Sequence, residues 1–394
     1  MFMENDTVSG GPEVSAATDT QTIIENAAVK VSVRERLKLK RWAWFARRTG
    51  AEDTALHPMF IWPRSYKRYQ SGFGGYFDEH AAEFGDYISH KAISGRIRKR
   101  LEAFSTGSGE PFLIIRRVFS RRYPQRSLTR SLEDDPSYPT RKIAGEEAAD
   151  LMEIRRYDRV AAALIAGAGA ELRQKQPTQH VYHDFITAGA TEKNQFADGG
   201  DMHLRYRTAT PEQPPARSGG AGKAARIVLF ACVENPIADP IYLIRADEVV
   251  SKLSPEHKKL LRESTFLFFD NWVSAEVRRY RTTDGKHILY DGNSETDPWL
   301  SFDPNRFDPT FSKTTAPDLV AVGALMASIQ QIAATSARPI VLRRGDALLV
   351  DNYRALTRRQ EHGYAYIVFK PFMRKRRRPP IRWLRTYYGF PKKN

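Results

Sequence analysis

The spacing of apolar residues changes along the chain, from a helical period in the first part to strand-like runs in the second. Residues 76–104 and residues 145–170 carry apolar side chains at about every third or fourth position, which predicts two amphipathic helices. Gly107 and Gly109 end the first of these stretches. The apolar run at 111–115 then predicts a short buried strand.

From about residue 178 onward, the pattern predicts short β-strands separated by polar turns. These strands are expected at residues 180–186, 226–233, 241–244, 265–269, 277–281, 287–290, 340–342, 347–350 and 364–372. One helix, at residues 318–334, interrupts them. This order indicates a single α+β unit in which the strands form a sandwich or barrel with helices on one side. The lack of strand–helix alternation and of a Gly-rich phosphate loop argues against a doubly wound nucleotide-binding fold.

The same patterns divide the chain into four parts. Residues 1–30 are small and polar and are expected to be a disordered lead. Residues 31–75 are expected to form a basic N-terminal extension, and residues 76–373 the folded domain. Residues 374–394 are expected to form a basic, aromatic C-terminal tail.

The net charge of +16 is concentrated in two peripheral segments. Residues 370–394 contain ten Lys and Arg and no acid, and residues 34–48 carry a net charge of +6, so the remainder is balanced. A protein that reads nucleic acid more often carries its basic residues on the folded surface. The cations and aromatics after residue 374 suit an acidic partner, such as nucleic acid, an anionic membrane or an acidic protein. The favoured alternative is a solubilising tail whose aromatics fold back onto the core.

Composition excludes several classes of protein. Hydrophobic residues make up 41% of the 394 positions, enough for a sizeable core, so a wholly disordered chain is excluded. Cys232 is the single cysteine, which excludes an internal disulfide and a cysteine zinc cluster. No apolar run approaches the roughly 18 residues of a transmembrane helix, and the first residues lack the apolar core of a secretory signal. A cytoplasmic location is therefore expected.

Two segments contain polar residues in a distinctive order. The first includes His183 and then His203-Leu-Arg205, followed by the apolar strand at 226–233. The second is the run Gly-Asp-Ala-Leu-Leu-Val-Asp-Asn-Tyr-Arg at 345–354. Together they resemble the clavaminate synthase-like and taurine dioxygenase-like oxygenases over roughly residues 75–373.

This resemblance implies a double-stranded β-helix, or jelly roll, with flanking helices. It also implies Fe(II) and 2-oxoglutarate as cofactors and a small, amino-acid-like or other specialised-metabolite substrate. In such enzymes two His and one carboxylate bind iron on one face and leave the other face open.

The expected iron ligands are only partly present. His203 matches the first ligand of the family, but Arg205 stands where the family has a carboxylate and Thr357 stands where it has the second His. An Arg cannot coordinate iron because it has no available lone pair. The chemistry of this site is therefore expected to be altered at Arg205 and Thr357.

One rearrangement would restore a second His. His362 lies five residues beyond Thr357, and an insertion or β-bulge could turn it inward. Arg374 would then lie at about the family's spacing for the Arg that binds 2-oxoglutarate. The alternative is that His362 lies in a polar loop and that Arg374 begins the solvated tail. His180 and His183 point to opposite faces of one strand, and His183 is expected to be structural.

The sequence leaves two functions open. In the first, the protein is an oxidoreductase of the iron and 2-oxoglutarate class with an altered metal site. In the second, it has lost iron and binds a ligand or partner, or performs non-oxidative chemistry in the same pocket. A desolvated guanidinium is costly to leave unpaired, so Arg205 is expected to meet a bound carboxylate or phosphate, a nearby acid (Asp201, Asp198 or Glu192) or water. The resemblance also places six acids where related enzymes have substrate-recognition loops, and each is expected to be an ordinary exposed acid: Glu276, Asp291, Glu295, Asp297, Asp303 and Asp308.

Overall fold

The computed structural model describes most of the expected folded domain and a few residues outside it. The described residues are 28–30, 81–119, 146–173, 182–187, 205–209, 215, 224–235, 238–264, 266–268, 287–292, 297–304, 307–308, 319–359 and 382–392. Within them, no helix has both the length and the apolar composition needed to cross a membrane.

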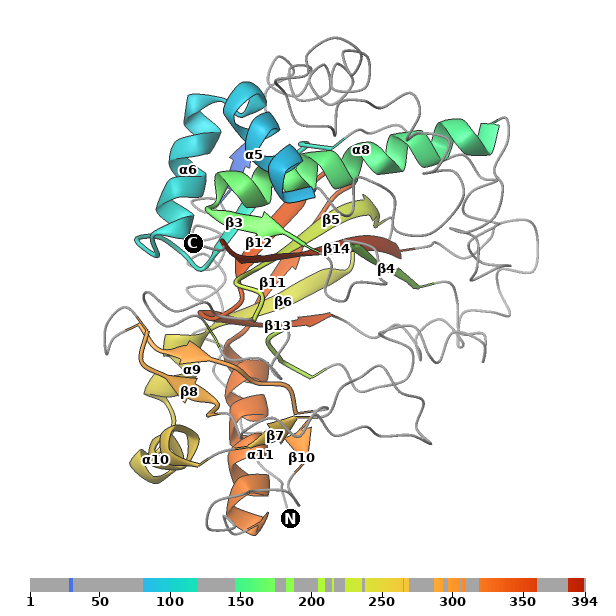
Figure 1. Cartoon of the computed structure of the whole chain (residues 1–394). Coiled ribbons are helices and arrows are strands. Elements are labelled where there is room, and N and C mark those ends of the chain that lie inside the picture. The colour runs from blue at the N-terminus through green and yellow to red at the C-terminus, as the bar shows by residue number, and fades with distance from the viewer. Residues whose placement is uncertain are drawn as a thin grey trace, which may run out of the picture.

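Two β-sheets form the centre of the molecule (Figure 1). The larger sheet has the order β1-β2-β12-β5-β14-β3, and β4 also pairs with β14. Its strands are β1 (Ala28–Lys30), β2 (Phe112–Arg116), β12 (Ala347–Asp351), β5 (Ile227–Glu234), β14 (Arg382–Pro391), β3 (Ala170–Leu172) and β4 (Tyr182–Thr187). The smaller sheet has the order β11-β6-β13, from β11 (Arg338–Val341), β6 (Pro240–Arg245) and β13 (Ala355–Arg359). Except for β1 with β2, all these pairs are antiparallel.

Side chains that alternate along the strands fill the space between the two sheets. On β5, Val228 and Phe230 join this core, whereas Ile227 and Leu229 face the other way. The core also contains Phe112, Ile114, Cys232, Ile241, Leu243, Ile340, Leu342, Leu348, Val350, Ala355 and Leu384. The two sheets therefore pack face to face. Alternate residues of a strand such as β5 face this core, and the residues between them face the other side of the larger sheet.

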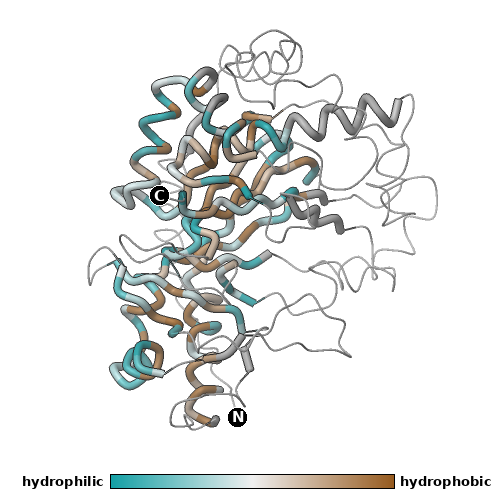
Figure 2. Tube along the Cα trace, in the orientation of Figure 1, coloured by the Kyte–Doolittle hydropathy of each residue, from teal (hydrophilic) through white to brown (hydrophobic). Residues whose placement is uncertain are grey.

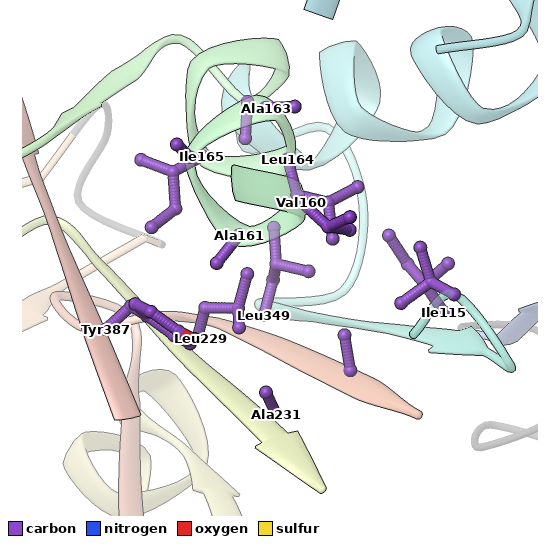
Figure 3. Close-up of a cluster of buried hydrophobic side chains, with 14 of the residues drawn as sticks. Ile115, Val160, Ala161, Ala163, Leu164, Ile165, Leu229, Ala231, Leu349 and Tyr387 are labelled. Carbon is purple, nitrogen blue, oxygen red and sulfur yellow. The ribbon is translucent and has the colours of Figure 1, made fainter. Parts of the chain in front are cut away.

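Helices cover the outer face of each sheet. The larger sheet is covered by α5 (Ala81–Ala92), α6 (Gly95–Ser105) and α8 (Glu146–Gly167). Figure 3 shows Val160, Ala161 and Leu164 of α8 above Leu229 and Leu349 of the sheet. The smaller sheet is covered by α9 (Ala246–Ser251), α10 (Pro255–Glu263) and α11 (Leu319–Ser336). The expectation of helices on one side was wrong, because the smaller sheet also has an apolar outer face to bury.

The remaining strands are two short ladders on the side of the smaller sheet. These are β7 (Leu267–Phe268) with β10 (Phe307–Asp308), and β8 (Leu289–Tyr290) with β9 (Trp299–Leu300). Figure 2 shows apolar residues along the strands of both sheets and along α11, with hydrophilic residues on the exposed helices. The layered arrangement in Figure 1 is thus reflected in the distribution of hydropathy.

Most predicted elements are confirmed, with one change in the first helix. The predicted helix at 76–104 is two helices, separated at Ile93 and Ser94, and residues 76–80 lie outside the described part of the chain. The Ser94 hydroxyl accepts a hydrogen bond from Ile97 N at 3.4 Å and so caps α6. The predicted strands at 277–281 and 364–372 also lie outside the described residues.

The C-terminal segment packs onto the core, as its favoured alternative expects, and it does so as a strand of the larger sheet. Residues 382–391 form β14, which pairs with β5 along one edge and with β3 and β4 along the other. Tyr387 and Arg385 of this strand are buried, and both donate a hydrogen bond to Asp158 of α8, at 2.7 and 3.0 Å. The basic residues made this segment resemble a solvated tail, although the Arg385 charge is paired with Asp158 inside the fold. Residues 374–381 lie outside the described part of the chain.

The predicted N-terminal lead differs in a smaller way. Residues 28–30 form β1, which pairs parallel to β2 at the edge of the larger sheet. This short pairing shows that the end of the lead is ordered where it meets an open sheet edge. The rest of the lead and the basic extension lie outside the described residues.

Candidate functional site

The Asp351–Arg354 segment connects β12 to β13 and fixes the strands around it. The Asn352 side chain accepts a hydrogen bond from Ala209 N at 2.6 Å and donates to Ala209 O at 2.9 Å and Ala225 O at 2.8 Å. Asn352 is buried, so these bonds satisfy an amide that would be costly to leave unpaired. The amide thereby holds residues 205–209 in place.

The other side chains of this segment are also engaged within the fold. Tyr353 donates its hydroxyl proton to Ala224 O at 3.0 Å, and its backbone N donates to the Asp351 carboxylate at 3.1 Å. Burial raises the pKa of Asp351, against the attraction of Arg226 and Arg354. Arg354 donates to the Asp297 carboxylate at 2.6 Å. The run that carries the family resemblance therefore has a structural role at these positions.

Asp346, near the start of the same run, closes the turn before β12. Its carboxylate accepts hydrogen bonds from Arg343 N at 3.0 Å, Arg117 N at 2.9 Å and the Arg116 guanidinium at 2.7 Å. Gly345 has a φ of 83°, a left-handed conformation that side chains disfavour. The Gly-Asp pair is thus explained by turn geometry.

Residues 205–209 lie beside the edge of β13 that does not pair with β6, and the chain bends at Tyr206 and Ala209. Arg207 and Thr357 form a β-bridge, with N–H···O distances of 3.0 Å from Arg207 and 2.9 Å from Thr357. The Gln330 side chain of α11 accepts from Tyr206 N and donates to Tyr206 O, both at 2.9 Å. This amide acts as a short substitute for a neighbouring strand, so the segment is held on both edges.

Alternation along these strands determines which side chains face the larger sheet. Ala355 and Leu243 belong to the core between the sheets, whereas Leu356 and Tyr206 belong to the core beneath the smaller sheet. Thr357 is two residues after Ala355, directly opposite Leu243 on one side and Arg207 on the other. Thr357 and Arg207 therefore occupy inward-facing positions, whereas a bend at Tyr206 interrupts the alternation before Arg205.

Burial decreases from Ala355 to Thr357 along this face of the smaller sheet. Ala355 is 1% exposed, Thr357 is half-buried, and Arg205 is exposed. The acids nearest to Arg205 in sequence, Asp201, Asp198 and Glu192, lie outside the described residues, so its predicted pairing with an anion, an acid or water stays a prediction.

Arg207 lies deeper and has an acidic neighbour. Its Nη1 is 3.3 Å from an oxygen of Asp303, whose side chain is buried. Asp303 is therefore not the exposed loop acid that was expected, and Asp297 is likewise engaged by Arg354. The neighbouring Thr208 exchanges hydrogen bonds with Phe302, which brings Asp303 to this segment.

The outward-facing side chains of the same strands form a separate cluster. The Arg358 guanidinium lies 5.6 Å from the ring centroid of Tyr206 and 5.9 Å from that of Tyr242. Burial raises the pKa of Tyr206, and the nearby Arg358 charge opposes this shift. Arg358 therefore contributes to packing beneath the sheet.

A second ionic cluster lies at the end of β5. Glu234 is the last residue of β5 and lies beyond an irregularity in the ladder, since consecutive residues Leu384 and Trp383 of β14 pair with Cys232 and Glu234. Burial raises the pKa of Glu234 to about 7, although Arg344 donates to its carboxylate at 2.6 Å. Burial therefore disfavours the charged form of Glu234, while the Arg344 guanidinium favours it.

The predicted site residues are only partly placed by the structure. The structure pairs Thr357 with Arg207, and Arg205 precedes Arg207 across a bend at Tyr206, so the common site of Arg205 and Thr357 stays a prediction. His203, His362 and Arg374 lie outside the described residues. His183 lies on β4, opposite Thr386 of β14, in the other sheet.

The described residues do not fit an iron site. Arg205 and Arg207 carry positive charge and have no lone pair for a metal, and Thr357 offers a neutral hydroxyl. No group of three His, Cys, Asp or Glu side chains with metal-binding geometry occurs among the described residues. Arg207 was missed by the sequence reasoning, although the alternation that groups residues 203 and 205 also includes it.

Comparison with known proteins gives structural relatives only. No family model matches the chain, and no curated protein matches it. Among solved structures, the chain is similar to the non-heme iron oxygenase OrfP in complex with Fe, succinate and (3S)-hydroxy-L-Arg. The two share 16% identity with a TM-score of 0.55, over 93% of this chain and 94% of the other. An asparagine oxygenase in complex with Fe(II), 2S,3S-3-hydroxyasparagine and succinate shares 12% identity with a TM-score of 0.57, over 92% of this chain and 93% of the other. At these identities the comparison establishes a common fold: this chain has the fold of the non-heme iron oxygenases.

Proposed function

We propose that this chain is an oxidoreductase-class protein that takes an amino-acid-like small molecule between the two sheets of its β-sandwich. The observation that carries the proposal is the shared fold, because the matched oxygenases align with nearly the whole chain and bind arginine- or asparagine-derived ligands. In this proposal, the two facing sheets are the two halves of a double-stranded β-helix.

The metal of such an enzyme would depend on residues outside the described part of the chain. His203 and His362 are the residues that would hold Fe(II), and Arg374 would bind 2-oxoglutarate. Iron and 2-oxoglutarate together would supply the oxidant for a C–H bond. A regular ladder continued from the Arg207–Thr357 pair would put residue 362 on the face opposite to residue 203. His362 therefore requires a β-bulge to reach the same metal.

A second function is favoured by the inner face of β13 and its neighbour. With Thr357 and Arg207 at this face, the protein would bind a ligand or partner without iron, or perform non-oxidative chemistry. This candidate is consistent with the residue types at these positions, because Arg205 and Arg207 would repel a metal cation.

Metal analysis after anaerobic reconstitution with Fe(II) separates the two candidates. The oxidoreductase proposal expects stoichiometric iron in the wild-type chain and its loss in His203→Ala and His362→Ala. His90→Ala is the matched control, because His90 is an exposed residue of α5 and should leave iron binding unchanged. Little iron in the wild-type chain would reject the oxidoreductase proposal and support the iron-free candidate.

A gain-of-binding variant tests the register on which both candidates depend. Arg205→Glu combined with Thr357→His restores the family's ligand types at positions 205 and 357. The double variant should bind Fe(II) more tightly than the wild-type chain, as measured by anaerobic titration. No gain would mean that these positions do not converge with His203.

A further inference from the structure

The turn before β12 brings together four arginines that neither candidate function uses. They are Arg116 and Arg117 at the end of β2, and Arg343 and Arg344 after β11. We propose that the surface around Arg117 and Arg343 binds the phosphodiester backbone of a nucleic acid. The proposal goes beyond both candidate functions, because this surface needs neither iron nor a ligand between the sheets.

One buried carboxylate fixes the two exposed arginines next to each other. Asp346 is 1% exposed, and its carboxylate accepts hydrogen bonds from Arg117 N at 2.9 Å and from Arg343 N at 3.0 Å. Both arginines are exposed, and they belong to segments that are far apart in sequence. Two main chains that bind the same carboxylate must lie side by side, so two guanidinium groups are attached to one part of the surface.

The charge of these two groups is not neutralised within the part of the chain that the structure describes. The Asp346 carboxylate is already paired with Arg116, whose Nη1 lies 2.7 Å from its Oδ2. Arg344 has a carboxylate partner of its own at 2.6 Å, as described above. Among the described residues, no acidic side chain contacts the side chain of Arg117 or Arg343. The turn therefore carries a net positive charge from these two residues.

The sequence on either side of the turn also lacks acids that could neutralise them. Residues 111–132 contain six Arg and no Asp or Glu, and residues 319–345 contain three Arg and no Asp or Glu. Glu110, the nearest acid before Arg117, lies 3.5 Å from Arg245 and so has another partner. The acids closest in sequence to the two exposed arginines are therefore already engaged.

The backbone of Arg117 supports a role for its side chain. Arg117 has a φ of 59°, a left-handed conformation that favours Gly or Asn over a long side chain. The turn uses only the backbone N–H of Arg117, which the other residue types would supply equally well. Strained residues of this kind are frequent at functional sites, so the guanidinium is the part of this residue that calls for a ligand.

The chemistry of the surface favours phosphate over other acidic partners. A guanidinium presents parallel N–H donors that match two oxygens of one phosphate, and a nucleic acid offers a phosphate at every nucleotide. A surface that binds a membrane would add aromatic or large aliphatic side chains. Among the described residues, the exposed large apolar side chains are Val320 and Val341, and neither is aromatic.

Fluorescence anisotropy of the full chain with a short labelled DNA duplex, and with an RNA duplex of the same sequence, tests the proposal and distinguishes the two sources of the backbone. At least one duplex should bind saturably and more weakly as salt is added. Arg117→Gly combined with Arg343→Ala should weaken binding about tenfold or more and reduce the slope of log affinity against log salt by roughly two. Gly suits the backbone at position 117, so Arg117→Gly should unfold in urea no earlier than the wild-type chain.

A charge-matched variant separates this surface from general attraction to a basic protein. Lys259→Ala combined with Arg262→Ala also removes two cations, from α10 on the outer face of the smaller sheet (Figure 1), and it should leave affinity and salt slope nearly unchanged. An equal loss in both double variants would overturn the proposal, as would the absence of saturable binding to either duplex. Binding of poly-L-glutamate or of phosphatidylserine vesicles in place of the duplexes would assign the surface to a different partner and would also overturn it.

Discussion

Residues 351–354, which precede β13, and Thr357, in the middle of that strand, lie close in sequence but in different surroundings. The first group is buried or nearly so, and Asn352 alone makes three hydrogen bonds to backbone groups of other segments. Thr357 is half-buried, and its backbone is paired to that of Arg207. Within a few residues the chain thus passes from a buried, hydrogen-bonded turn to a partly exposed strand position.

This difference shows what a motif match can and cannot report. The Asp-Asn-Tyr-Arg residues are required by the packing of three segments, so their presence indicates the fold. The position of Thr357 is not constrained by such bonds, and its side chain can change without loss of the turn. Fold and chemistry are therefore separable here at the level of individual positions.

The largest effect on stability is expected from Asn352→Ala, in the buried turn at residues 351–354. Two backbone carbonyls and one backbone N–H would lose their partner in a buried environment, which should lower the free energy of unfolding by about 3 kcal/mol or more. Urea unfolding measures this loss. Gln331→Ala, at an exposed position of α11, is the control and should change stability by less than about 0.5 kcal/mol. A loss below about 1 kcal/mol in Asn352→Ala would mean that water replaces the amide.

A smaller effect is expected from Tyr353→Phe in the same turn. The substitution keeps the buried ring against Trp299 and removes only the hydroxyl that donates to Ala224 O. The free energy of unfolding should fall by about 1–2 kcal/mol, because one buried carbonyl loses its donor. Thermal or urea unfolding gives the value. An unchanged stability would show that this bond is not part of what holds the turn.

Glu234 is predicted to make stability depend on pH. Its pKa in the folded chain is about 7, above the ordinary value of 4.5, so the folded state holds the proton more tightly than the unfolded state. Its contribution is fully present below pH 4.5 and is lost as the pH rises to about 7. Arg344 and solvent limit the size of this change to roughly 1 kcal/mol. Unfolding of Glu234→Gln across this range should be flatter with pH, and an identical slope would contradict the assignment.

The smallest effect on stability is expected at Thr357, on β13. Thr357→Val should change the free energy of unfolding by no more than about 0.5 kcal/mol, since the hydroxyl is half-exposed and the β-bridge uses only backbone atoms. Urea unfolding of this variant beside Asn352→Ala gives the contrast directly. A large loss in Thr357→Val would show that this position is also built for stability.

Much of the fold follows from the sequence because burial imposes a visible period. Strand β5 was expected because both faces of the larger sheet are covered, which requires a continuous apolar run. The break at Ser94 was missed because apolar residues keep their period across it. Strand β14 was missed because Arg385 reads as a solvent residue until its partner Asp158, far away in sequence, is known.

The candidate site was predictable only in its local part. Alternation alone would put residues 205 and 207 on one face, but the chain bends at Tyr206 between them. The pairing of Arg207 with Asp303 and the support of Tyr206 by Gln330 join segments that are distant in sequence. Nothing in the local pattern of either segment encodes the other, so these contacts required the three-dimensional structure.

The place of β14 in the larger sheet has a consequence for how the chain folds during synthesis. β14 lies between β5 and both β3 and β4, yet it is translated after all of them. Until it emerges from the ribosome, the sheet remains split, with unpaired edges that can associate with other chains. The buried Asp158 of α8 gains its hydrogen bonds from Arg385 and Tyr387 only after β14 has been synthesised. The domain therefore has a late, non-local closing step, which slows folding and makes a nascent chain that lacks β14 a natural client for chaperones.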